Sequence, residues 1–464
     1  MTNELAYLSA CDLVDGYRKS TFSPAEALEA CLGQIDALDG TLNAMAHVAR
    51  DSARAEAEAS SARWASCNSM GPLDGVPVAV KDLIPVARMP LRYGSLASDD
   101  GPVGEDAPSV THLRNSGAVI VGKTCTAEHG WNGVCENAQT GLTRNPWNTE
   151  KTPGGSSGGS GVAVATGMAA LALGGDEGGS IRIPSSFCGI TGLKPTWGRV
   201  PLHQPANCGT WSHVGPMARR VADLALGLNV LGKPDPRDWE SLPDDGTNYL
   251  SHLSGEVKGL RVALSPGLGF VDLEPEVEAA VRASADVFRD LGAQVTEATP
   301  DLADPIEPYY VLVRLAARAI VDSVPASRRP QLNQRMLMDA ADADRHSAMD
   351  VKRAEMEQRR IGAVMAQFFT RFDILLTATT AVPAFETGIT DPSGGERADL
   401  PWEGTLYTTN FTRQPGLSVP CGQTAEGLPI GLHVVGARYR DALVLRAAHA
   451  FETAVPAIGL PPLA

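Results

Sequence analysis

Short apolar runs, bounded by glycine, proline or polar residues, recur along the chain. Four of these runs predict strands: Val76–Val80, Ala118–Val121, Leu260–Leu264 and Asp373–Thr377. Between the last two runs, Pro275–Leu291 has apolar side chains at helical spacing and predicts an amphipathic helix. Strands that alternate with helices are typical of an α/β protein. We therefore expect a large, twisted, mixed and mostly parallel sheet with helices on both faces.

Two further segments are predicted to be helical. Ser23, Pro24 and Glu26 indicate a helix start, because serine is a good N-cap, proline fits the first helical position and the glutamate closes a capping box. We therefore expect N-terminal helices within residues 1–70. Residues 301–371 contain apolar helical patches and match no motif, and we expect them to form a wall or lid of a substrate pocket.

Six large side chains of this last segment are candidates for lining the pocket, although such helical stripes more often belong to a core. They are Tyr309, Tyr310, Leu312, Leu315, Met336 and Met338.

Charge and composition exclude several classes of protein. The chain of 464 residues has 39 basic and 54 acidic side chains, a net charge of −15, whereas nucleic-acid binding needs basic patches. We expect no nucleic-acid partner and no membrane association, because the chain starts without a signal-like segment and the apolar run near Gly161 is too short to span a bilayer. Eight scattered cysteines are typical of reduced thiols, which favours a cytoplasmic protein.

Metal and cofactor motifs are missing from the sequence. The nine histidines form no His-Glu-x-x-His, and the cysteines form no Cys-x-x-Cys. The glycine-rich run at residues 153–160 lacks the lysine of a phosphate-binding loop. We predict no metal and no cofactor.

Two serines in glycine-rich turns and one lysine suggest hydrolytic chemistry. Ser156 lies in the run Pro-Gly-Gly-Ser-Ser-Gly-Gly-Ser, and Ser180 follows 24 residues later, directly after Gly178 and Gly179. A serine hydroxyl needs a base to become a nucleophile, and a lysine kept neutral by burial can provide it. Lys81 ends a predicted apolar strand and suits that role. The paired glycines allow backbone N–H groups to approach an oxyanion closely.

Other interpretations of these residues are weaker. A flexible linker would not lead directly into the apolar run that follows residue 160. Lys81 could be a structural lysine, although unpaired lysines are rarely buried. The sequence Gly-Ser-Ser-Gly-Gly also fits the nucleophile elbow of α/β-hydrolases, which would select Ser157. That elbow needs a strand immediately before it, and the preceding residues are polar and end in Pro153.

The motifs together resemble the amidase signature family. The resemblance extends over roughly residues 70–225 and 405–455. Its motifs are residues 73–82, Asn-Pro-Trp at 145–147, the run at 153–160, Gly-Gly-Ser-Ile-Arg-Ile-Pro at 178–184, Phe-Cys-Gly at 187–189, Gly-Leu-Lys-Pro-Thr at 192–196, and residues 416–420 and 427–432.

The resemblance implies a fold and a set of roles. It implies the amidase signature fold, with residues 1–464 as a single domain and residues 71–225 as its core, although Lys233–Thr247 is a candidate linker. In the family's mechanism Ser180 would be the nucleophile, Ser156, after a cis peptide bond with Gly155, the proton relay, and Lys81 the base. The oxyanion hole would consist of the backbone amides of Glu177, Gly178, Gly179 and Ser180.

One residue departs from the family's pattern. Glu177 lies where members usually have a small or neutral residue, and a carboxylate near Lys81 would raise the pH at which that base works. Gly130, Trp131 and Asn132 lie in the loop that faces the reacting carbonyl in related enzymes. Trp131 favours an aromatic or apolar substrate.

We therefore expect an amidase that cleaves the C–N bond of aryl or apolar amides through an acyl-enzyme, with carbamates (urethanes) and esters as further substrates. The expected partner is a small-molecule amide, and a homodimer is left open. The alternative is a glutaminase subunit of a tRNA-dependent amidotransferase, which would supply ammonia to a partner chain.

Overall fold

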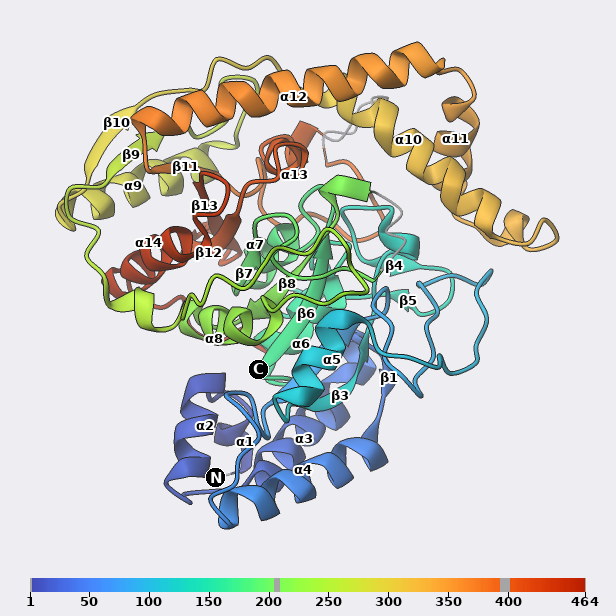
Figure 1. The fold of residues 1–464 in the computed structure, drawn as a ribbon, viewed down its shortest axis with the longest axis vertical. Helices are drawn as coiled ribbons and strands as arrows, with labels where there is room; N and C mark the ends of the chain where they lie inside the picture. The colour runs from blue at the N-terminus through green and yellow to red at the C-terminus, as the bar shows by residue number, and fades with distance from the viewer. Residues whose placement is uncertain (1, 204–208, 393–400, 464) are drawn as a thin grey trace.

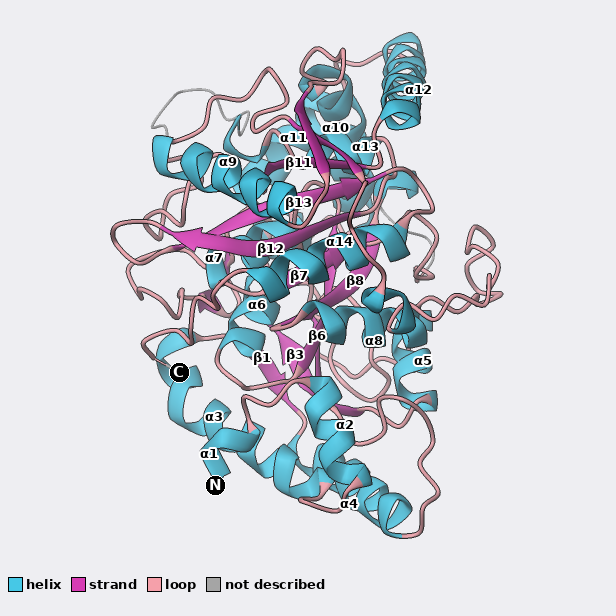
Figure 2. Cartoon of the chain, turned by 90° about the vertical axis from the view of Figure 1, so that its left-hand side faces the viewer, coloured by secondary structure: helices cyan, strands magenta, loops and turns pink. Residues whose placement is uncertain are grey.

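A computed structural model describes residues 2–203, 209–392 and 401–463, and an eleven-stranded sheet runs through it (Figures 1 and 2). The strands, in their order across the sheet, are β1 (Met45–Val48), β3 (Val119–Thr124), β2 (Pro77–Lys81), β6 (Leu171–Asp176), β8 (His213–Ala218), β7 (Thr191–Lys194), β12 (Gly416–Gln423), β13 (Pro429–Gly436), β11 (Ile374–Ala378), β9 (Arg261–Leu264) and β10 (Gln294–Glu297). A separate pair consists of β4 (Glu136–Asn137) and β5 (Gly141–Leu142).

Helices lie on both faces of this sheet. They are α1 (Thr2–Leu5), α2 (Ala10–Arg18), α3 (Pro24–Leu42), α4 (Arg50–Ala65), α5 (Pro108–Asn115), α6 (Gly158–Ala165), α7 (Arg182–Cys188), α8 (Val221–Leu231), α9 (Pro275–Asp290), α10 (Ile306–Ser323), α11 (Gln334–Ala343), α12 (Ala348–Arg371), α13 (Tyr407–Phe411) and α14 (Asp441–Ala454). The predicted α/β class with a large mixed sheet is confirmed.

The side chains of β2 point alternately to the two faces of the sheet and so identify what covers each face. Val78 and Val80 pack into a core with α2, α5, α8, α9 and α14. Ala79 points to the opposite face and packs into a second core with α3, α4 and α6. Successive side chains of a strand point to opposite faces, so an apolar run without alternation predicts a strand buried on both sides.

The expectation of a mostly parallel sheet is wrong. Within the described part of the eleven-stranded sheet, four pairings are parallel and six are antiparallel. The antiparallel pairings fill the middle of the sheet, from β6 to β11. There, β12 and β13 are joined by residues 424–428 alone. Parallel neighbours need a crossover of a dozen or more residues, so this connection allows only an antiparallel hairpin.

The predicted local elements agree closely with the structure. The four strands begin one residue later than predicted, and the predicted helix at 275–291 is α9. Ser23 caps α3 and forms the capping box with Glu26. The N-terminal region also contains β1, an edge strand that pairs with β3, so the expectation of helices alone in residues 1–70 is incomplete.

Helices α10, α11 and α12, which we call the helical arm, lie in gold and orange in Figure 1, with α12 along the top and α10 and α11 at the right. They contribute to two small cores, one around Met336 and one around Ile361, and α12 also packs on β9, β11 and β13.

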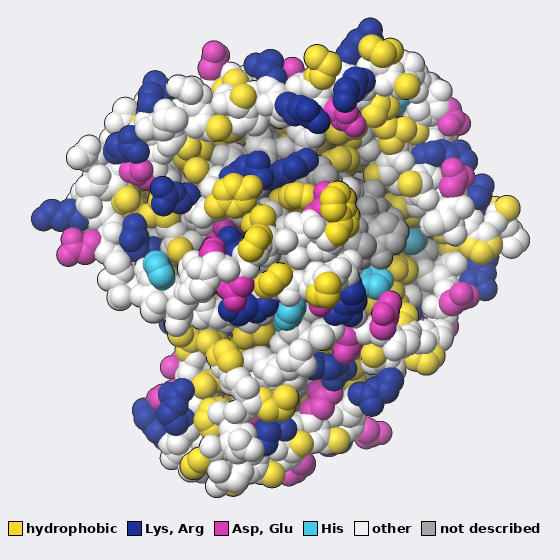
Figure 3. All heavy atoms as spheres, in the orientation of Figure 1, with side chains coloured by type: hydrophobic (Ala, Val, Ile, Leu, Met, Phe, Trp, Pro, Cys, Tyr) yellow, Lys and Arg dark blue, Asp and Glu magenta, His cyan; other side chains and the backbone are white. Residues whose placement is uncertain are grey.

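Lys and Arg side chains are interspersed with Asp and Glu over the face in Figure 3. No helix in the described ranges combines the length and apolarity needed to cross a membrane.

Candidate active site

Lys81 and Ser156 meet beneath the surface of the molecule. Lys81 is the last residue of β2, and its Nζ donates to Ser156 Oγ at 2.6 Å and to the Gly175 carbonyl at 3.3 Å. Both side chains are fully buried. Burial lowers the pKa of Lys81 to about 8, although the nearby Glu177 carboxylate acts in the opposite direction. The amine is therefore more readily freed of its proton than an exposed lysine.

Ser156 follows a cis peptide bond with Gly155, as expected. A side chain at Gly155 would place its Cβ 2.6 Å from the Val134 backbone, so this turn requires glycine. The next residue, Ser157, is fully buried and its hydroxyl donates to the Gly175 carbonyl at 3.1 Å. No strand immediately precedes it. Ser157 thus lacks both the position and the exposure of an elbow nucleophile.

Ser180 lies in the loop between β6 and α7 and lines a cavity. Its carbonyl accepts a hydrogen bond from Ser157 N at 3.2 Å, which fixes this loop beside the Ser156 turn. The Ser180 hydroxyl makes no hydrogen bond to Ser156 or Lys81 among the described contacts. The structure therefore joins the lysine to the first serine and places the second serine on the cavity side.

Asp176 organises the Ser180 loop from below. Its carboxylate accepts from Gly179 N at 2.8 Å and from Ile181 N at 3.1 Å. Arg182 donates to the same carboxylate through Nε at 2.9 Å and Nη2 at 2.8 Å. Burial raises the pKa of Asp176, but the Arg182 guanidinium outweighs this effect and holds that pKa well below its usual range.

One of these contacts involves an amide of the expected oxyanion hole. The Gly179 N–H donates to Asp176 Oδ1. The Glu177 N–H lies against its own carboxylate. The other two backbone N–H groups of the expected oxyanion hole, those of Gly178 and Ser180, have no hydrogen-bond acceptor among the described residues. The sequence could not show this, because it depends on where the Asp176 side chain points.

Glu177 lies near the lysine across Gly175. A Cβ placed on Gly175 would be 3.7 Å from Glu177 Oε1 and 3.8 Å from Lys81 Nζ. Burial raises the pKa of Glu177 to about 7, although Lys81 opposes the change. The two groups therefore influence each other's protonation.

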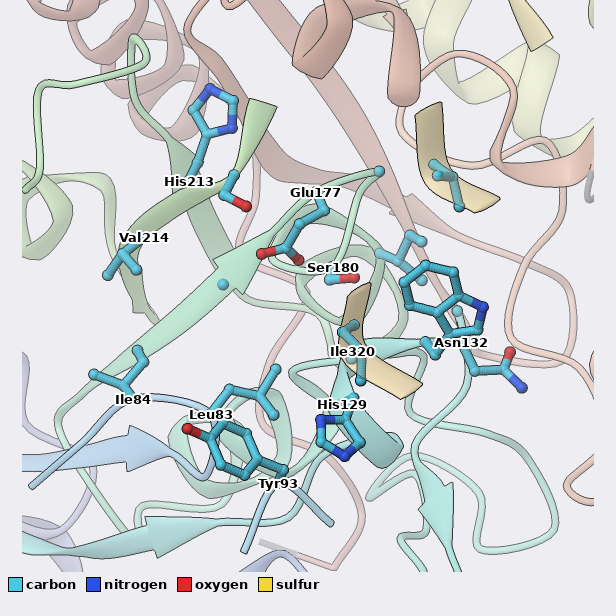
Figure 4. A pocket seen from close by; sticks show the side chains of 18 of the residues that line it. Leu83, Ile84, Tyr93, His129, Asn132, Glu177, Ser180, His213, Val214 and Ile320 are labelled. Atoms are coloured by element: carbon cyan, nitrogen blue, oxygen red, sulfur yellow. The ribbon is translucent and has the colours of Figure 1, made fainter. Parts of the chain in front are cut away.

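The cavity beside Ser180 has a volume of about 380 Å³. Figure 4 shows Glu177 and Ser180 near its centre and Tyr93 and His129 at one end. The rings of Tyr93 and His129 stack at 5.2 Å, and both residues have a left-handed backbone, with φ of 55° and 48°. Such strained positions are favoured where a surface must be held in one shape. Desolvation lowers the pKa of His129 to about 4, so its ring is neutral.

The predicted pocket loop lines this cavity, with Gly130, Trp131 and Asn132 all contributing. A Cβ on Gly130 would be 3.3 Å from Ser156 Oγ, so glycine keeps the loop close to the serine. Trp131 Nε1 donates to Asp339 Oδ2 at 2.8 Å and ties the loop to α11.

Two of the six candidates from the helical arm line the cavity, namely Tyr309 and Tyr310. Leu312 and Met336 are buried in the arm's cores, Leu315 is half-buried, and Met338 is exposed. Sequence reasoning missed Leu83, Tyr93 and His129. Leu83 offered a signal, since it lies two residues after Lys81.

Within the described ranges, no group of three or more His, Cys, Asp or Glu side chains is placed to hold a metal ion. The chemistry that this geometry supports is that of a serine activated through a second serine and a lysine.

Known proteins share both the sequence and this architecture. The sequence model of the Amidase family matches residues 26–445. The chain belongs to the amidase signature family. This amidase is 36% identical to an acylamidase of Rhodococcus erythropolis, with 97% of this chain and 96% of the relative covered. It is also 36% identical to a glutamyl-tRNA(Gln) amidotransferase subunit of Chloroflexus aurantiacus, with 97% of each chain covered.

A solved structure of a bacterial aryl acylamidase of the same family matches with a TM-score of 0.91 at 29% identity, over 97% of this chain and 96% of that one. The amidase is therefore an enzyme that acts on C–N bonds, and its predicted family is confirmed.

Proposed function

We propose that this amidase hydrolyses aryl or apolar amides, with Ser180 as nucleophile, Ser156 as relay and Lys81 as base. The observation that supports this most directly is the 2.6 Å contact between Lys81 and Ser156 beneath the cavity that Ser180 lines. A buried lysine with a lowered pKa is suited to accept a proton near neutral pH.

The reaction has two stages. Ser180 Oγ attacks the amide carbon, and its proton passes through Ser156 to Lys81. The N–H groups of Gly178 and Ser180 stabilise the negative carbonyl oxygen, and each such donor is worth roughly 3 kcal/mol in the transition state. Ser156 then protonates the departing nitrogen as the C–N bond breaks. Water attacks the acyl-enzyme by the same route and releases the acid.

The lining of the cavity supports the substrate preference. Leu83, Ile84, Tyr93, Trp131 and Tyr309 present apolar and aromatic surface in the cavity that Ser180 also lines. Stacking on such rings favours flat, apolar groups. The names acylamidase and aryl acylamidase, given to two similar proteins, agree with this preference. Carbamates and esters are included, because an acyl-enzyme mechanism makes few demands on the leaving group.

A glutaminase subunit is the second candidate. It is favoured by the 36% identity to an amidotransferase subunit, equal to that of the acylamidase. Glutamine has an ammonium and a carboxylate, and Arg335, whose Nε donates to Asp339 Oδ2 at 3.0 Å, supplies a positive charge at the cavity wall.

A substrate panel separates these functions. It holds an aryl acyl anilide, an aliphatic amide, an aryl carbamate, an ester and glutamine, tested with wild type and Ser180→Ala. We expect the anilide to be the best substrate and the variant to be inactive, because it lacks the attacking oxygen. Glutamine as the only substrate would favour the subunit.

A fluorophosphonate probe tests the nucleophile independently. It should label Ser180 in the wild type and nothing in Ser180→Ala. Label on Ser157 would overturn the assignment.

A further inference from the structure

Tyr309 reaches the Ser180 loop from the helical arm. It lies in the first turn of α10, and its hydroxyl donates a hydrogen bond of 3.1 Å to the Glu177 carbonyl. No sequence motif marks the segment that contains it. The arm therefore contributes a contact to the loop that holds the nucleophile.

This contact depends on a close approach. A Cβ on Gly178 would lie 2.5 Å from the Tyr309 hydroxyl oxygen, so only glycine leaves room for it. The Tyr309 ring stacks on Tyr407 at 5.2 Å and meets Phe411 edge to face at 6.1 Å. Aromatic neighbours on two sides restrict the ring, so the hydroxyl is held in place.

The Glu177 carbonyl and the Gly178 N–H belong to the same peptide group. Among the described residues the cis peptide is the one at Gly155–Ser156, so the Glu177–Gly178 peptide is trans. In a planar trans peptide the carbonyl and the N–H point in opposite directions. A hydrogen bond to the Glu177 carbonyl therefore fixes the direction of the Gly178 N–H. The same hydrogen bond also polarises the N–H.

That N–H matters because few donors remain for an oxyanion. The Gly179 N–H is used by Asp176, and the Glu177 N–H lies against its own side chain. We infer that Tyr309 is a positioning residue, which orients the Gly178 N–H toward the oxyanion formed on attack by Ser180. This inference rests on the proposed function, because the oxyanion arises only if Ser180 attacks a carbonyl.

The test uses Tyr309→Phe, which removes one oxygen and keeps the ring. With an aryl acyl anilide we expect kcat to fall about threefold to tenfold, the range of one net hydrogen bond, while KM changes less than twofold. Affinity for an aryl trifluoromethyl ketone should fall by the same factor as kcat. In that adduct Ser180 Oγ bonds to the ketone carbon, the serine proton passes through Ser156 to Lys81, and the ketone oxygen becomes an alkoxide in the oxyanion position.

Tyr407→Phe is the matched control. It removes a hydroxyl from the same aromatic cluster, but that hydroxyl bonds Asp304 and not the loop. We expect it to leave the ratio of ketone affinity to KM unchanged. Equal losses in both variants, a loss confined to KM, or unchanged ketone affinity in Tyr309→Phe would each overturn the positioning role. Thermal unfolding of both variants shows whether either has lost its fold.

The two proposals fail in different ways. If Ser180→Ala kept wild-type turnover, the proposed function would be wrong whatever Tyr309→Phe did. If Ser180→Ala were inactive and Tyr309→Phe matched wild type, only the positioning role would be wrong.

Discussion

Burial lowers the pH at which Lys81 becomes a free base, and the charge on Glu177 raises it. Burial lowers the pKa of Lys81 to about 8, and the Glu177 carboxylate limits that decrease. Glu177 itself has a pKa raised by burial to about 7, so it is mostly ionised where Lys81 loses its proton. The negative charge stabilises the ammonium form and delays the appearance of the base.

Glu177→Gln should therefore move the acidic limb of the pH–rate profile to lower pH. In the wild type, activity rises with pH through about 8, because the neutral amine is the active form. Without the neighbouring charge the amine is neutral at lower pH. The measurement is kcat/KM for an anilide across the pH range, in wild type and variant.

Glu386→Gln is the control for this shift. Glu386 pairs with Lys151 on the surface and does not line the cavity, so its replacement also removes one negative charge, but not from the cavity wall. Its profile should match the wild type. A Glu177→Gln profile that stayed in place or moved to higher pH would contradict the assigned interaction.

For single residues, the sequence predicted which side chains lie together but not which hydrogen bonds each residue makes. The contact between Lys81 and Ser156 and the cis bond at Ser156 follow the expectation. The sequence did not predict that the Gly179 N–H would donate to the Asp176 carboxylate. That carboxylate is held in position by Arg182. A motif identifies residue types, whereas the free donors depend on side-chain direction.

The loop from β6 to α7 depends on one buried ion pair. Asp176 and Arg182 are both fully buried, and Arg182 also donates to Asn410 Oδ1 at 2.6 Å. Removing one partner of such a pair leaves the other charge uncompensated, which costs about 3–5 kcal/mol. Asp176→Asn should therefore lower the free energy of unfolding by about that amount. Denaturant unfolding of the variant measures the change.

Glu278→Gln provides the comparison at an exposed pair. Glu278 binds Arg282 one turn away on the surface of α9, and such pairs contribute only about 0.2–0.5 kcal/mol. If Asp176→Asn were no more destabilising than Glu278→Gln, the buried pair would not support the loop.

Elements that are short and local were predicted well, and their pairing was not. The β2 and α9 segments have clear periodicity and were found within one residue of the structure. The strands β12 and β13 had been recognised only as motifs, so the antiparallel centre of the sheet was missed. Apolar runs identify strands, but strand direction depends on connections that the pattern does not show.

Across the whole molecule, the helical arm packs against the sheet as well as against the cavity. Phe368 of α12 lies in one core with Leu375 and Val435 of the sheet. The sheet cores are extensive, whereas the arm's cores are small. The arm is tied to the cavity loops by polar contacts: Trp131 binds Asp339, and Arg328 binds Asp99. The sequence predicted that residues 301–371 would shape the pocket, but these contacts are not local in sequence and could not be predicted. The treatment of the chain as a single domain stays a prediction.

The position of the helical arm should be most sensitive to a change at Glu128. Its carboxylate accepts from the Ser95 hydroxyl with one oxygen and from Asn333 N, at the start of α11, with the other. An amide offers one acceptor where a carboxylate offers two. Glu128→Gln should thus release one contact and speed hydrogen exchange about tenfold or less at the start of α11, consistent with one lost hydrogen bond.

Hydrogen exchange followed by mass spectrometry locates this effect. The start of α11 should exchange faster, while β2 and β6 stay protected, because their hydrogen bonds lie inside the sheet. Glu355→Gln removes a carboxylate from the exposed side of α12 and should change neither region. Faster exchange throughout the sheet would mean that Glu128 supports the whole fold, and unchanged exchange at α11 would mean that the arm is held by its apolar contacts alone.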